Sequence, residues 1–196
     1  MDATASREPT WDFACHIQAD MFSETAGLGG LELCLCYYGG FEKFKASGWL
    51  SNSESLSSAM TRVRCEGGLT QISRVLRHAV TESKREPIDA LVFVGDCMEE
   101  EIDRLCHHAG ELALLGVPAF MFHEGSDPIA EKAFREVARL TGGAYSRFDL
   151  SSAHTLRDLL RAVAVFAAGG RKALAHFENA RGGKTLRLSH QLGKRQ

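Results

Sequence analysis

The stretch ALVFVGD (residues 90–96) decides the fold class. It is apolar from Ala90 to Val94 and ends in a glycine followed by an aspartate. A run that is apolar at consecutive positions is typical of a strand covered on both faces, as in parallel sheets. Ligands of such sheets bind at the carboxyl ends of the strands. We therefore expect Asp96 to lie at the edge of the sheet where a ligand binds.

Other strand-like segments lie on both sides of this stretch. They are LELCLCYY (31–38), the less regular FEKFKAS (41–47), AFMF (119–122) and AYSRF (144–148). The pair Gly39-Gly40 predicts a tight connection from the first of these to a short edge strand.

Helical periodicity fills the intervals between the strands. Apolar residues recur at i, i+3, i+4 and i+7 within segments 72–80, 102–113, 130–138 and 156–167, and a further helix is predicted from about Pro9 to Thr25. Glycine pairs follow the third and fourth of these segments and predict helix ends there. The alternation predicts an α/β fold with an open, mostly parallel, Rossmann-like sheet and helices on both faces.

Composition narrows the function classes. With 44% hydrophobic and 24% charged residues in 196, the chain has the mix of a folded domain. A net charge of -2 gives no reason to expect nucleic acid or an acidic membrane as a partner. The longest apolar stretch, LALLGVPAFMF, is well short of the ~20 residues of a membrane helix. The six cysteines form no Cys-x-x-Cys pair and no basic-then-apolar leader is present, so we expect reduced thiols in a cytoplasmic protein.

The composition changes near the carboxyl end. From Arg171 onward the chain carries seven Lys or Arg residues but a single acidic residue, Glu178. We therefore expect one folded domain at residues 1–168, followed by a basic, partly helical tail at 169–196. A charge run of this kind is usually a solvated face.

Side chains with oxygen atoms that can bind a metal lie in three separate segments of the sequence. They are Asp2, Thr4 and Ser6 in the pattern D-x-T-x-S, Thr70 in the glycine-rich loop GGLTQ, and Asp96. Carboxylates and hydroxyls suit Mg²⁺ or Mn²⁺ and do not suit zinc. The pattern therefore predicts a site for a hard divalent cation.

Four more acidic residues follow the same strand ends. Glu99 and Glu100 come shortly after Asp96, while Glu124 and Asp127 follow the strand at 119–122. Acidic residues at such places commonly stabilise helix N-termini. The alternative is that they support the metal ligands or contact a partner. Plainer roles are open for the main donors too, as helix caps or turn residues.

The ordered set of D-x-T-x-S, Thr70 and Asp96 on this strand–helix pattern resembles the von Willebrand factor A (VWA) domain family, over residues 1 to about 168. The resemblance implies a metal-ion-dependent adhesion site (MIDAS). In it the hydroxyls of Thr4, Ser6 and Thr70 would bind Mg²⁺ or Mn²⁺ directly, and Asp2 and Asp96 would bind directly or through water. Thr4 stands where the family usually has Ser.

Few ligands of such a site are charged, so the ion stays electron-poor and can accept an Asp or Glu from a partner protein. The resemblance thus implies a protein-interaction module, not an enzyme, in a cytoplasmic bacterial protein. An ATPase or chaperone-like machine is the partner class that it suggests.

Two other functions compete. A phosphatase-like hydrolase of the haloacid-dehalogenase type would use Asp2 as its nucleophile, but it needs a second Asp at position 4, which is Thr. No activated nucleophile–base pair is visible. The third hypothesis is a degenerate scaffold that binds no metal.

The start of the chain departs from the family pattern. An apolar strand precedes the metal motif in the family, whereas only Met1 precedes Asp2 here. Each missing core side chain forfeits roughly 1.5–3 kcal/mol of burial, against a net stability of about 5–15 kcal/mol. We therefore expect the first central strand to be truncated, and the complete protein to have an apolar strand upstream.

Overall fold

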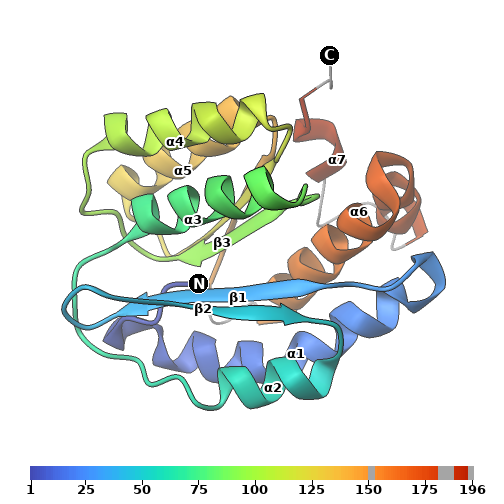
Figure 1. Ribbon diagram of the computed structural model, residues 1–196, viewed down its shortest axis with the longest axis horizontal. Helices are drawn as coiled ribbons and strands as arrows, with labels where there is room; N and C mark the ends of the chain where they lie inside the picture. Colours follow the sequence, from blue (N-terminus) through green and yellow to red (C-terminus); the bar gives the residue numbers. More distant parts are fainter. Residues whose placement is uncertain (150–152, 181–187, 194–196) are drawn as a thin grey trace.

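The computed structural model describes residues 1–149, 153–180 and 188–193 (Figure 1). Its strands are β1 (Leu33–Gly39), β2 (Lys43–Leu50), β3 (Leu91–Gly95), β4 (Ala119–Glu124) and β5 (Ala144–Phe148). Its helices are α1 (Glu8–Thr25), α2 (Ser53–Met60), α3 (Ile72–Arg85), α4 (Ile102–Leu114), α5 (Pro128–Thr141), α6 (Ala153–Ala180) and α7 (Leu188–Gln191), with 3-10 turns η1 (Ala5–Arg7) and η2 (Ala26–Leu28).

The strands form two groups. β1 and β2 are an antiparallel hairpin, and β3, β4 and β5 form a parallel sheet in that order. The predicted mostly parallel α/β class is therefore confirmed. β2 lies at one edge, as the glycine pair before it predicts.

The N-terminal residues join the two groups of strands. The Ala3 N–H donates to the Tyr38 carbonyl of β1 at 2.8 Å, and the Asp2 N–H donates to the Val94 carbonyl of β3 at 3.0 Å. Asp2 pairs with Tyr38 in the parallel sense. Residues 1–3 thus occupy the place of a central strand between β1 and β3.

Helices cover both faces of the parallel sheet (Figure 1). On the face of α3, α4 and α5, the core forms around Phe93, Met121 and Phe134. On the opposite face, Phe120 packs with Leu159 of α6. β4 is buried at all six positions, which is the environment that its unbroken apolar run predicts. No helix in the described ranges has both the length and the apolar character needed to cross a bilayer.

Helix α2 is an element that the sequence analysis missed. The Asn52 side chain accepts a hydrogen bond from the Ser55 N–H at 2.8 Å and caps the helix. Leu56 and Met60 are its buried residues, and they pack with Trp11 of α1. Two apolar contacts in a helix of two turns are too few to give a readable period.

The glycine pair at 169–170 produces a kink, where the sequence predicted a helix end. Gly170 has φ 68° and ψ -167°, a conformation that glycine tolerates at little cost. Beyond it α6 continues to Ala180, and Leu174 is fully buried. Part of the predicted basic tail, residues 181–187 and 194–196, lies outside the described residues.

Helix α7 covers the free edge of the parallel sheet. The Gln191 side chain accepts from the Tyr145 N–H of β5 at 3.0 Å and donates to the carbonyl of the same residue at 3.0 Å. The amide side chain therefore satisfies backbone groups that an edge strand would otherwise expose. This part of the predicted tail packs against the domain.

Substitutions at two glycines should change the stability of the fold in opposite directions. At Gly143 an added Cβ would lie 2.0 Å from the Ala119 carbonyl oxygen of β4, whereas at Gly110 of α4 it would meet nothing within 4 Å. We predict that Gly143→Ala lowers the free energy of unfolding by about 1–3 kcal/mol through overpacking. Gly110→Ala should raise it by about 0.5–1 kcal/mol through helix propensity. Urea unfolding measures both, and equal effects of the two variants would contradict the β4–β5 arrangement.

Candidate metal centre

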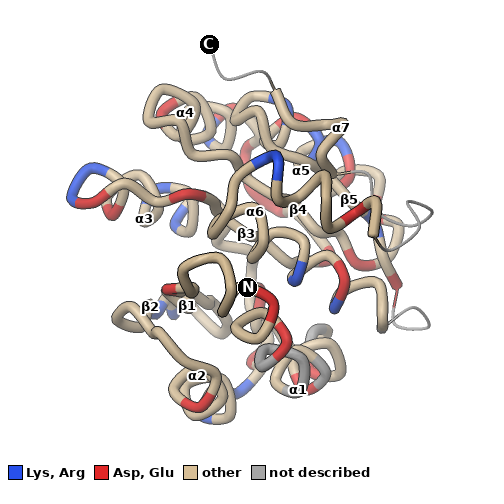
Figure 2. Tube along the Cα trace, turned by 90° about the vertical axis from the view of Figure 1, so that its right-hand side faces the viewer, with Lys and Arg blue, Asp and Glu red and all other residues tan. Residues whose placement is uncertain are grey.

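The candidate site lies directly after residues 1–3, at the carboxyl end of β3. Asp2 is 1% exposed because its backbone is held between β1 and β3. Its hydrogen bond to Val94 brings it level with Asp96, which follows β3 directly. Figure 2 shows acidic parts of the chain beside the N-terminus, between the β1–β2 hairpin and the parallel sheet.

A chain of hydrogen bonds links the D-x-T-x-S motif to Asp96. The Thr4 N–H donates to Asp2 Oδ1 at 2.8 Å, and the Thr4 hydroxyl lies 3.3 Å from that of Ser6. The Ser6 hydroxyl donates to Asp96 Oδ2 at 2.7 Å. One carboxylate oxygen each of Asp2 and Asp96, together with the Cys97 sulfur, lie within 4.8 Å of one another. The fold thus brings together four of the five predicted ligands.

The donor set fits a hard divalent cation. Asp96 Oδ1 is buried, and within the described residues it has no hydrogen-bond partner. A buried carboxylate oxygen left in that state is costly, and a cation would satisfy it. Two carboxylates and two hydroxyls in one place are the oxygen donors that Mg²⁺ and Mn²⁺ prefer.

Two neutral side chains border the carboxylates. Burial, followed by the negative charge of Asp2, raises the pKa of Tyr38 well above its usual range. Burial, with the charges of Asp96 and Asp2 added, raises the pKa of the Cys97 thiol to about 12. Both groups keep their protons at neutral pH. These two neighbours therefore do not balance the negative charges of Asp2 and Asp96, and a cation would.

Thr70 joins this edge through the loop that follows β3. Its N–H donates to Glu99 Oε2 at 3.1 Å, and its hydroxyl accepts from the Glu99 N–H at 3.0 Å. Glu100 accepts from the N–H groups of Ile72, at 2.5 Å, and Ser73, at 3.0 Å. Within the described residues, no hydrogen bond links the Thr70 hydroxyl directly to the D-x-T-x-S motif or to Asp96.

Glu99 and Glu100 therefore clamp two loops together. The sequence analysis expected them to stabilise a helix N-terminus. The helix that they stabilise is α3, which lies about 28 residues earlier in the chain, and not α4, which follows them directly. Local sequence could not reveal this role, because the pairing depends on how α3 packs beside β3.

The acidic residues at the end of β4 and in the loop after it hold neighbouring helices. Glu124 accepts a hydrogen bond from the hydroxyl of Thr10, on α1, at 2.6 Å, and both residues are buried. Asp127 accepts from the Ile129 N–H at 2.9 Å and caps α5. These contacts anchor helices around the site and leave the role of partner contact untested.

His123 is a site residue that the sequence analysis missed. It is fully buried on β4, with Nε2 3.2 Å from the Asp96 carbonyl oxygen and Nδ1 2.9 Å from the Tyr145 hydroxyl. Burial lowers the pKa of His123, so the neutral ring is favoured. It can donate from Nε2 and accept at Nδ1, which fixes the backbone of Asp96. A histidine at the end of an apolar strand was its one signal.

Comparison with known proteins identifies the fold. No protein-family model and no curated protein matches the chain. Among solved structures, it is similar to a von Willebrand factor type A protein from Catenulispora acidiphila, at 17% identity and a TM-score of 0.68. The match covers 86% of this chain and 41% of that chain.

Two further structures have the same fold. Proximal thread matrix protein 1 from the mussel byssus, with a zinc-occupied MIDAS motif, matches with a TM-score of 0.67 at 12% identity, over 83% of this chain and 44% of that chain. The SpRpn10 VWA domain matches with a TM-score of 0.61 at 14% identity, over 84% of this chain and 90% of that domain. The chain spans less than half of the first two proteins and has the fold of a VWA domain, as the sequence predicted.

The loop clamp can be tested with two neighbouring glutamates. Glu100→Gln removes the charge that accepts two backbone N–H groups of α3, and we predict a loss of about 1–3 kcal/mol in the free energy of unfolding. Glu101→Gln is the matched control, because Glu101 is exposed and its side chain makes no capping hydrogen bond to α4. Urea unfolding should separate the variants, and equal stability would refute the clamp.

Proposed function

We propose that this chain is a metal-ion-dependent protein-interaction module. It binds Mg²⁺ or Mn²⁺ through Asp2, Thr4, Ser6, Thr70 and Asp96. The observation that carries the proposal is the direct bond from Ser6 to Asp96, across 90 positions of sequence, beside a buried carboxylate oxygen of Asp96 that has no hydrogen-bond partner within the described residues. The mussel protein of the same fold, with zinc in its MIDAS motif, supports a divalent metal at this place.

The bound ion would supply a positive, electron-poor centre open to one more oxygen ligand. The side chains around it would set its surroundings. Asp2 is held by the Thr4 N–H, and Ser6 orients Asp96. His123 fixes the Asp96 backbone. A carboxylate from an Asp or Glu of a partner protein would complete the coordination, because it is the common anionic oxygen ligand of such ions.

Apolar side chains lie next to this edge. Phe41, in the β1–β2 turn, is 89% exposed, and Leu69, adjacent to Thr70, is 69% exposed. Both line one hollow together with Arg74 and Arg104. Large exposed apolar residues gathered beside polar ones are a mark of protein interaction sites. The partner would therefore combine an acidic ligand with an apolar contact.

Binding, not catalysis, is the proposed activity. A hydrolase using Asp2 as nucleophile would need an acid–base group two positions later, and Thr4 instead donates its N–H to that carboxylate. We further propose a bacterial, cytoplasmic setting, with an ATPase or chaperone-like machine as the partner class.

Metal binding should raise thermal stability. With Mg²⁺ or Mn²⁺ at 100 times the dissociation constant, we expect about 2.7 kcal/mol of stabilisation, measured as a rise in Tm. Ser6→Ala and Asp96→Asn should remove most of this rise, since each loses a ligand. Ser58→Ala, on an exposed face of α2, is the control and should respond as the wild type does. A wild type that ignores both metals would overturn the proposal.

Partner capture should depend on the metal. We predict that proteins retained by the immobilised chain in Mg²⁺ are released by EDTA and are not retained by Asp96→Asn. Phe41→Ala with Leu69→Ala should weaken capture while leaving the metal-induced rise in Tm intact, because these side chains contact the partner and not the ion. Capture that is indifferent to EDTA would contradict a carboxylate bridge.

A further inference from the structure

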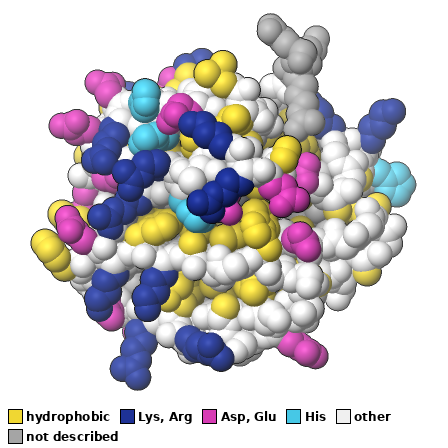
Figure 3. All heavy atoms as spheres, in the orientation of Figure 1, with side chains coloured by type: hydrophobic (Ala, Val, Ile, Leu, Met, Phe, Trp, Pro, Cys, Tyr) yellow, Lys and Arg dark blue, Asp and Glu magenta, His cyan; other side chains and the backbone are white. Residues whose placement is uncertain are grey.

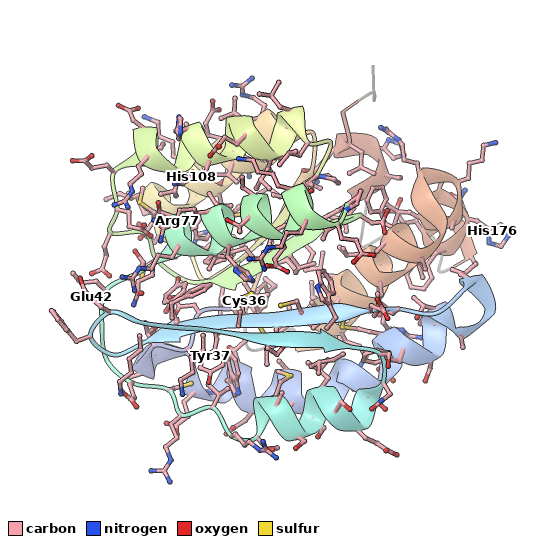
Figure 4. All side chains as sticks on the ribbon, in the orientation of Figure 1. Cys36, Tyr37, Glu42, Arg77, His108 and His176 are labelled. Carbon is pink, nitrogen blue, oxygen red and sulfur yellow. The ribbon has the colours of Figure 1, made fainter. Side chains whose placement is uncertain are left out.

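A second group of metal-ligating side chains lies away from the Asp2–Asp96 edge. Cys34 and Cys36 lie on either side of Leu35 on β1, at an irregularity in its pairing with β2, and the sulfur of Cys34 lies beside His78 of α3. Figure 4 shows Cys36 between β1 and α3. The two sulfurs are 3.9 Å apart, and the Cys34 sulfur is 4.0 Å from Nε2 of His78 on α3.

These separations are close to those of a tetrahedral zinc site. Bond lengths of about 2.3 Å to sulfur and about 2.0–2.1 Å to imidazole nitrogen put two sulfurs roughly 3.8 Å apart, and sulfur and nitrogen roughly 3.5 Å apart. The observed sulfur–sulfur distance exceeds its ideal value by about 0.1 Å, and the sulfur–nitrogen distance exceeds its own by about 0.5 Å. All three donor atoms also lie within 4.8 Å of one another. Small rotations of the side chains would therefore bring them onto one ion.

The two thiols of β1 lie within hydrogen-bonding distance of each other. A hydrogen bond from the Cys36 thiol, followed by His78, lowers the pKa of Cys34 to about 6, against the opposing effect of burial. The same bond raises the pKa of Cys36. Metal binding requires the thiolate form of cysteine.

The surroundings leave this group open. Cys34, Cys36 and His78 are only partly buried, and they line an apolar cavity of about 180 Å³ between β1, β3 and α3. Figure 3 shows hydrophobic side chains exposed at the surface between α3 and the β1–β2 hairpin, with Lys and Arg side chains beside them. Glu82, one helical turn after His78, borders the same cavity and forms an ion pair with Arg85 at 3.1 Å. The fourth coordination position therefore faces a space that water can enter.

We propose that Cys34, Cys36 and His78 form a zinc site that is separate from the oxygen-donor site at Asp2 and Asp96. Thiolate and imidazole donors suit Zn²⁺ and do not suit Mg²⁺. Binding forms two zinc–sulfur bonds and one zinc–nitrogen bond, with water in the fourth position. The Cys36 proton, and any proton remaining on Cys34, pass to solvent, and His78 binds as the neutral ring.

Such a site would fasten the β1–β2 hairpin to α3. On the side of β1 that faces the parallel sheet, its backbone carbonyls accept hydrogen bonds from Met1 and Ala3. An ion shared by β1 and α3 would add a strong link between this strand and a helix that covers the parallel sheet. Since β1 also holds Tyr38 beside Asp2, this link would help to position the proposed Mg²⁺ site.

Cobalt provides a direct readout. The full chain, kept reduced, is titrated with Co²⁺, and we expect one equivalent to produce a sulfur-to-cobalt charge-transfer band and tetrahedral d–d bands, which Zn²⁺ then abolishes. Cys34→Ser, Cys36→Ser and His78→Gln should weaken binding by at least about 10–100-fold, the loss that removal of an outer partner already causes. Cys106→Ser, a partly buried cysteine on α4, is the matched control and should keep the bands.

The outcomes separate this site from the proposed Mg²⁺ site. Asp96→Asn should keep the cobalt bands while losing the Mg²⁺-induced rise in Tm, and Cys34→Ser should still show that rise if it folds. Circular dichroism checks the folding of each variant. A wild type that gives no sulfur-to-cobalt band refutes the zinc site without recourse to any variant. Bands that survive Cys34→Ser, or that vanish in Cys106→Ser, refute the ligand assignment.

Discussion

Three backbone hydrogen bonds at the start of the chain hold the architecture together. The Met1 amino group and the Ala3 N–H donate to carbonyls of β1, and the Asp2 N–H donates to the Val94 carbonyl of β3. They connect the hairpin to the parallel sheet. They also bury Asp2 between two strands and place it beside Asp96. The same contacts that complete the sheet therefore create the candidate metal centre, and losing them would cost both.

The polar residues around that centre divide into donors and supports. Asp2, Ser6 and Asp96 belong to one hydrogen-bonded group, and a cation would offset the negative charge of its carboxylates. Glu99 and Glu100 satisfy backbone groups of the Thr70 loop and α3, while His123 holds the backbone behind Asp96. This division matters because the carboxylates of Glu99 and Glu100 already accept backbone N–H groups, whereas the buried Asp96 Oδ1 has no hydrogen-bond partner within the described residues.

The hairpin β1–β2 links the two proposed metal sites. Strand β1 carries Tyr38 next to the oxygen donors, and it also carries Cys34 and Cys36 near His78. The hard donors suit Mg²⁺ and the soft donors suit Zn²⁺. A single strand would thus help to position two ions of different chemistry. The apolar cavity between β1 and β3 is lined in part by Met1, the residue before Asp2.

The sequence by itself determined the class of fold and the candidate oxygen donors. Unbroken apolar runs predicted β3 and β4, helical periodicity predicted α3 and α5, and the spacing of Asp2, Thr4 and Ser6 indicated the metal motif. These are local patterns, because burial recurs with the period of the strand or helix that carries it. The tertiary structure alone decided that Glu100 caps α3 and that His78 meets Cys34, 44 positions away. It also decided that Gly170 bends α6 without ending it. Such contacts depend on strand register and helix packing, which bring distant residues together and leave no period in the sequence.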